Sequence, residues 1–95
     1  MVSDDTMASR SELNELRKIP HRELGIYSVE MTPEEAYSAG RNAGYTSLTI
    51  AHQLNLEATR EKHKHLYYRG ESYAERFKRM ANFAFKMHAE GRGVK

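Results

Sequence analysis

The sequence contains no cysteine. This absence excludes disulfide scaffolds, thiolate metal sites and catalysis by a thiol. No run of apolar residues approaches the roughly 18 that a membrane-spanning helix requires. The first ten residues are acidic and polar, unlike the basic and then apolar start of a secretory signal. We therefore expect a cytoplasmic protein that does not associate with membranes.

Large apolar residues are also scarce. Leu, Ile, Val and Phe together number 16 of the 95 residues, and the mean hydropathy is −0.81. Ten Ala, six Tyr and five Met supply further apolar surface, and the net charge of +2 is too small to favour disorder. We expect one folded domain with a thin core. A homodimer or another protein partner would bury additional surface.

Signatures of catalysis are missing as well. The chain has no Gly-x-Gly-x-x-Gly, no Gly-Lys-Ser/Thr phosphate loop and no Gly-x-Ser-x-Gly. Its histidines do not form a His-Glu-x-x-His pair or another closed ligand set, although His52 and His88 have positions from which two packed helices could bring them face to face. The sequence therefore predicts a non-enzymatic protein with no cofactor and no metal site.

Start and stop signals predict an all-α fold of about four helices. Residues 1–8 are expected to be a disordered tail, 9–91 a single helical domain and 92–95 a basic tail. The first helix is expected over about 11–18, followed by an extended strap over 20–31. The second begins at Thr32, where Thr-Pro-Glu-Glu has capping-box spacing, and runs to about residue 43, before Gly44.

The last two helices are predicted to form a long antiparallel hairpin. The third begins at Thr46 or Ser47 and, with no intervening Gly or Pro, continues to Arg69 and ends at Gly70. The fourth opens on the capping box that begins at Ser72 and ends near residue 91. A short loop between two helices favours their antiparallel packing.

Positive charge is concentrated in the second half of the chain. Residues 1–50 carry five Lys/Arg and eight Asp/Glu, whereas residues 51–95 carry ten and five. The segment 60–69 combines four fixed positive charges with two histidines and two tyrosines. Cations bind phosphate, and aromatic rings stack on unpaired bases. The predicted nucleic-acid site on these basic helical surfaces comprises Lys62, His63, Lys64, His65, Tyr68, Arg69, Arg76, Lys78 and Arg79.

The roles within that site follow from side-chain chemistry. Tyr68 and the histidines are expected to stack or form hydrogen bonds. The phosphate ligands are expected to be Lys62, Lys64, Arg69, Arg76 and Arg79. A solvated helix face, or a surface that meets an acidic patch of a partner protein, explains the same charges.

A helix-turn-helix is a second candidate. Gly40, Gly44 and Ile50 have the spacing of its small residue, its turn glycine and its buried apolar residue. Gln53 is a misfit, because an apolar residue is expected there. Close packing of two helices through small residues explains the spacing equally well. The second helix of the motif would present Thr46, Ser47, Thr49 and His52 to base edges.

Two functions therefore remain open. The leading one is a small regulatory protein that binds nucleic acid, DNA or RNA, through basic helical surfaces. The alternative is a helical protein–protein interaction module, such as an inhibitor or adaptor that occludes another macromolecule, with Tyr, Phe, Met and Arg at the interface. Nucleic-acid binding weakens steeply with salt, whereas an apolar protein interface does not.

Overall fold

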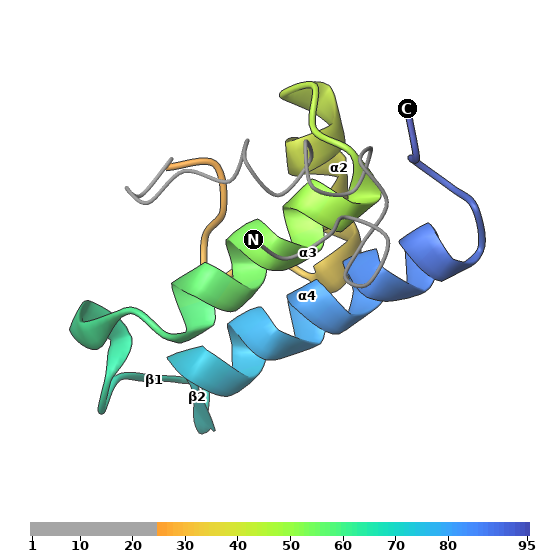
Figure 1. The fold of residues 1–95 in the computed structure, drawn as a ribbon. Helices are drawn as coiled ribbons and strands as arrows, with labels where there is room; N and C mark the ends of the chain where they lie inside the picture. Colours follow the sequence, from red (N-terminus) through yellow and green to blue (C-terminus); the bar gives the residue numbers. More distant parts are fainter. Residues whose placement is uncertain (1–24) are drawn as a thin grey trace, which may run out of the picture.

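The computed structural model describes residues 25–95, most of which are helical. The predicted first helix over 11–18 and the predicted tail over 1–8 lie outside these residues. The all-α prediction is confirmed for the described part, with one small antiparallel sheet in addition (Figure 1). The elements in chain order are α2 (Pro33–Asn42), α3 (Ser47–Ala58), the 3₁₀-helix η2 (Glu61–His63), β1 (Tyr67–Tyr68), β2 (Glu71–Ser72) and α4 (Tyr73–Ala89).

Helix α2 begins at the predicted capping box. The Glu35 backbone N–H donates to Thr32 Oγ1 at 3.1 Å, and the Thr32 N–H donates to Glu35 Oε1 at 2.9 Å. Pro33 occupies the first turn, where its missing N–H costs nothing. The helix ends at Asn42, and Gly44 then takes a positive φ of 92° to turn the chain toward α3.

Helix α3 ends at Ala58, so the predicted continuation to Arg69 is wrong. The Thr59 hydroxyl donates to the Leu56 carbonyl at 2.9 Å, and Arg60 has extended backbone angles. The chain then turns back so that His63 reaches Glu57 on α3. On a continuous helix these two residues would lie on different faces. Tertiary contacts have therefore overridden the helix-forming residues that follow Ala58.

Helices α3 and α4 lie side by side and run in opposite directions (Figure 1). Their connection is not the predicted tight turn at Gly70 but a segment that contains η2 and both strands. The predicted cap of α4 is confirmed, because the Glu75 N–H donates to Ser72 Oγ at 3.1 Å.

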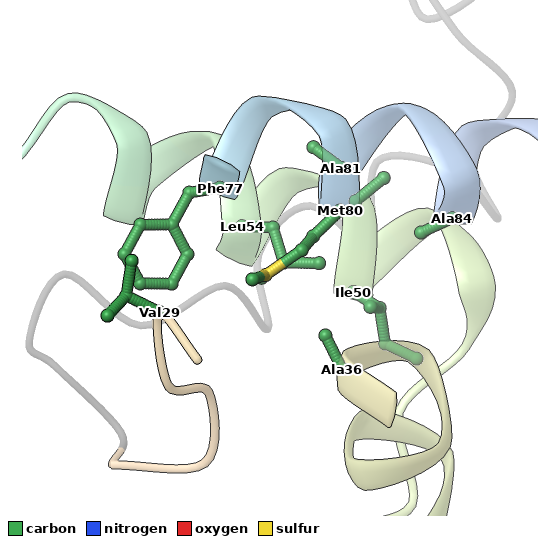
Figure 2. Packing of buried hydrophobic residues seen from close by; sticks show 9 residues of the cluster. Val29, Ala36, Ile50, Leu54, Phe77, Met80, Ala81 and Ala84 are labelled. Atoms are coloured by element: carbon green, nitrogen blue, oxygen red, sulfur yellow. The ribbon is translucent and has the colours of Figure 1, made fainter. Parts of the chain in front are cut away.

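The core lies where α2, α3 and α4 meet (Figure 2). Ile50 and Leu54 from α3 interleave with Phe77 and Met80 from α4, and the side chains of all four are almost completely buried. Small buried residues let the helices approach closely: Ala36, Ala51, Ala81 and Ala84. Gly40 belongs to this group, because a Cβ there would lie 2.5 Å from Ile50 Cγ1.

The segment before α2 covers one side of this core, as predicted for the described part of the strap. Val29 is buried near Phe77 (Figure 2), and its carbonyl accepts from Arg76 Nε at 2.7 Å. The Tyr27 hydroxyl donates to Gln53 Oε1. Burial, assisted by nearby Tyr45 and Glu57, raises the pKa of Tyr27 far above its usual value. This hydroxyl therefore remains protonated.

Among the helices formed by residues 25–95, none has the length and apolar character needed to cross a membrane.

Candidate nucleic-acid interface

Residues 60–72, which connect α3 to α4, form what we call the basic hairpin segment. Its strands pair Tyr67 with Ser72 and Tyr68 with Glu71. The two turn residues, Arg69 and Gly70, have φ values of 51° and 81°. Positive φ at both positions is the requirement of a type I′ turn, the commonest two-residue hairpin connection. Gly70 is therefore a hairpin residue rather than the end of a helix.

His63 anchors this segment to the core. Its side chain is only 9% exposed, and its Nε2 lies 3.0 Å from Glu57 Oε1. The other Glu57 oxygen accepts from Arg60 Nε at 2.8 Å. The imidazole also stacks on Phe77, with ring centroids 5.1 Å apart. His63 was predicted to face nucleic acid, but its burial gives it a positioning role instead.

Tyr68 and Arg76 fasten the hairpin to α4. The Arg76 guanidinium lies 4.7 Å from the centre of the Tyr68 ring, and that of Arg69 lies 5.5 Å from it. Arg76 also approaches Glu71 Oε1 at 3.4 Å while it donates to the strap. Tyr68 is thus occupied within the protein, and Arg76 is mostly buried. Neither is placed as a free group for nucleic acid.

Arg79 makes a bidentate pair with Glu71 across the start of α4. Its Nε and Nη2 donate to the two carboxylate oxygens at 2.8 and 2.6 Å. These hydrogen bonds are the main reason that the pKa of Glu71 is lowered and the pKa of Arg79 is raised. The Arg79 side chain remains about half exposed, so it is on the surface although it is paired.

The remaining predicted cations are at the surface. Lys62, Lys64 and His65 are exposed before the hairpin, Arg69 is exposed in its turn, and Lys78 is exposed on α4. Lys64 lies 3.7 Å from Glu61, and both side chains are mostly exposed. An ion pair of this kind is weak in water and yields readily to another anion.

Sequence reasoning missed the most prominent side chain of the segment. The Tyr67 side chain points outward and the residue is 69% exposed, next to Leu66 at 44%. Successive residues of a strand face opposite sides, so one of two adjacent tyrosines must face outward when the other packs inward. Gly70 is the one local signal of a turn in this stretch, and Arg-Gly is not one of the favoured two-residue hairpin pairs, so the sequence indicated a helix end there rather than a hairpin.

The helix-turn-helix candidate has a glycine with positive φ between its two helices, but its expected reading surface is mostly buried. Ser47 and Thr49 are fully buried, and Thr46 Oγ1 accepts from the Thr49 N–H at 3.3 Å as the cap of α3. His52 is half-buried, with its ring against Phe85 at a centroid distance of 5.3 Å. Gln53, the sequence misfit, is buried and bonded to Tyr27. Helix α3 is therefore the central helix of the core rather than a helix presented to DNA.

The C-terminal residues also pack against the start of α3, which makes it less accessible to DNA. Ser47 donates its N–H to the Gly93 carbonyl at 2.7 Å and its hydroxyl to the Arg92 carbonyl at 2.6 Å. Arg41 Nη2 donates to the Lys95 carbonyl at 3.1 Å. The predicted basic tail over 92–95 is thus held along its backbone, and it covers Ser47, one of the residues expected to contact bases.

A metal centre is not formed by the residues described. Across residues 25–95, no three His, Asp or Glu side chains come together as a group that could hold an ion. Burial first and the charge of His88 second lower the pKa of His52. Comparisons with protein-family models, with curated proteins and with solved structures give no match to this chain.

Proposed function

We propose that this is a small, non-enzymatic regulatory protein of the cytoplasm that binds nucleic acid through its basic hairpin segment. One observation carries the proposal. Strand β1, which carries the exposed Tyr67, lies at the same end of the molecule as the rest of the basic hairpin segment (Figure 1), where Lys62, Lys64, His65 and Arg69 are exposed. Cations that bind phosphate and a ring that stacks on bases are the two components of many nucleic-acid surfaces.

The excess of positive charge around the basic hairpin segment supports this location for the nucleic-acid site. Residues 60–79 carry seven Lys/Arg and three Asp/Glu. One of the three carboxylates, that of Glu71, is already neutralised by two arginines. Glu57, also at this end of the molecule, is paired with Arg60, so negative charge at the surface here comes mainly from Glu61 and Glu75. A polyanion would meet a positive field here, and such a field accelerates association and strengthens binding at low salt.

The structure suggests different roles for the predicted phosphate ligands. Lys62, Lys64, Arg69 and Lys78 are exposed and would meet phosphates directly. Arg76 and Arg79 instead hold Glu71, so they would act by fixing the hairpin. Four phosphate contacts predict a log–log salt slope of about −2.8 for single strands and about −3.6 for duplex DNA, which lowers affinity about 50- or 150-fold, respectively, between roughly 50 and 200 mM salt.

The first test is charge reversal followed by fluorescence anisotropy with labelled DNA and RNA, in single-stranded and duplex forms. The test variant replaces three exposed lysines near the hairpin: Lys62→Glu, Lys64→Glu and Lys78→Glu. The matched control changes the net charge equally at the opposite end of α4 (Figure 1): Lys86→Glu, Arg92→Glu and Lys95→Glu.

We expect the test variant to lose detectable binding and the control to lose only a few-fold, because contact charges matter more than net charge. Equal losses in the two variants would show that binding is not located at the hairpin. Absence of binding by the wild-type protein at the lowest salt would reject the nucleic-acid function.

A protein–protein interaction module is the second candidate, and exposed apolar side chains favour it. Leu66 stands beside Tyr67 in the hairpin segment, and Leu56 is exposed on α3. A partner with an acidic rim would suit the surrounding cations, and a second copy of the chain would cover these apolar residues. Light scattering at increasing concentration tests the homodimer. For another protein partner, affinity that barely changes with salt would distinguish this function from nucleic-acid binding.

A further inference from the structure

Tyr67 combines an exposed side chain with a backbone that is held in place. The strands hold it through the pairing with Ser72, and the Tyr73 N–H donates to the Leu66 carbonyl at 3.0 Å. The type I′ turn at Arg69–Gly70 closes one end of the hairpin, and buried His63 anchors the chain before the other end. Because the backbone of this residue is already ordered, binding a ligand needs to order only the side chain, which lowers the entropic cost of the contact.

The shape of this surface is poorly suited to a duplex groove. Each strand has two residues, so the hairpin extends only about 7 Å and presents one pair of side chains on each face. One face carries Tyr67 opposite Ser72, which is too small a set to read a sequence of base pairs in a groove. Helix α3, the predicted groove-reading helix, is buried in the core and covered at its start by residues 92–95.

Unpaired bases, in contrast, offer the surface that an exposed ring needs. In a duplex the base faces are covered by neighbouring base pairs, whereas in a single strand they are accessible for stacking on tyrosine. The cations at positions 62, 64 and 69 belong to the same short segment as this ring and would follow the phosphates on either side of a stacked base.

We infer that the ligand of the basic hairpin segment is single-stranded nucleic acid and that Tyr67 stacks on one of its unpaired bases. This inference rests on the proposed nucleic-acid function and names its ligand class. Single-stranded DNA and single-stranded RNA share the chemistry in question, and separate oligonucleotides of each distinguish them.

The decisive experiment compares three substitutions in the full chain by anisotropy with single-stranded and duplex oligonucleotides. Tyr67→Ala removes the ring and should weaken single-strand binding by about 5- to 150-fold, the effect of losing one base–aromatic stack. Tyr67→Phe keeps the ring and should retain affinity within about two-fold, since stacking does not require the hydroxyl. Leu66→Ala, an exposed apolar neighbour without a ring, is the matched control and should change affinity little.

An abasic oligonucleotide provides a second control, because it keeps the phosphates and lacks the bases. Wild-type protein should bind it about as weakly as Tyr67→Ala binds the normal strand. The chain has no tryptophan, so Tyr67→Trp introduces a single tryptophan, which can be excited selectively over the remaining tyrosines. Its emission should be quenched by the normal single strand and not by the abasic one.

Two results would overturn the inference and leave the proposed function in place. One is duplex affinity equal to or greater than single-strand affinity. The other is single-strand binding that Tyr67→Ala does not change while reversal of the hairpin lysines abolishes it. If the wild-type protein binds none of the oligonucleotides, the proposed function fails and the inference fails with it. Circular dichroism of each variant confirms that the fold is unchanged, as expected for exposed positions.

Discussion

Two histidines separated by one residue have opposite environments in this protein. His63 is buried between Glu57 and Phe77, whereas His65 is exposed with a positive φ of 72°. Side-chain chemistry gave both the same predicted role, because a sequence does not state which residue turns inward. The difference arises from the end of α3 at Ala58, which redirects the chain toward the core.

The His63 anchor can be tested by making the same substitution at both positions. His63→Asn should lower the free energy of unfolding by about 2–4 kcal/mol. It removes the ring that stacks on Phe77, and it weakens the hydrogen bonding of the buried Glu57 carboxylate. His65→Asn should change it by less than about 0.5 kcal/mol, since the side chain is exposed and Asn tolerates a positive φ. Urea unfolding followed by circular dichroism measures both. Equal effects would contradict the anchoring role of His63.

At the scale of secondary-structure elements, the sequence predicted correctly those helix starts that depend only on neighbouring residues. The caps at Thr32 and Ser72 depend on residues within one turn, and both appear in the structure as the sequence indicated. The end of α3 depends on a contact between Glu57 and His63 that requires the chain to turn, so helix-forming residues beyond Ala58 were misleading. The hairpin was missed for the same reason. Tyr67 became visible as a candidate contact only once the strands were known.

Substitutions at the two turn residues are expected to separate the effect of backbone geometry on stability, at Gly70, from the effect of charge on binding, at Arg69. Gly70→Ala should lower stability by about 1–2 kcal/mol, because an L-residue is strained at a φ of 81°. Arg69→Asn should leave stability unchanged or slightly higher, since Asn-Gly is the favoured type I′ pair. The same variant removes one cation, so the salt slope of nucleic-acid binding should become shallower by about one. Thermal unfolding and anisotropy in a salt series provide the two measurements, and an unchanged slope would show that Arg69 does not contact phosphate.

At the scale of the whole molecule, the pairing of α3 with α4 creates a dependence of stability on pH. Burial and the proximity of His88 lower the pKa of His52 below its usual 6.5 in the folded protein. The unfolded chain therefore binds more protons than the folded one just below pH 6.5, and stability falls as the pH is lowered through that range. The contribution is fully present above about pH 6.5 and is lost as the pH approaches the lowered pKa of the folded state.

Replacement of His52 tests this dependence directly. His52→Gln removes the titrating group, so its stability should decline less between about pH 7 and pH 5 than that of the wild type. His65→Gln removes an exposed histidine and should leave the wild-type decline in place. Urea midpoints at several pH values give the comparison. A decline as steep in His52→Gln as in the wild type would assign the pH dependence to other groups.

The bonds from Ser47 to Arg92 and Gly93 join residues about 45 positions apart in the chain. They satisfy a backbone donor and a side-chain hydroxyl at the first turn of the central helix, which is fully buried there. During synthesis on the ribosome, α3 is made long before these partners exist. The buried start of the helix that the core is built around therefore acquires these two bonds only after residue 93 has emerged, late in synthesis.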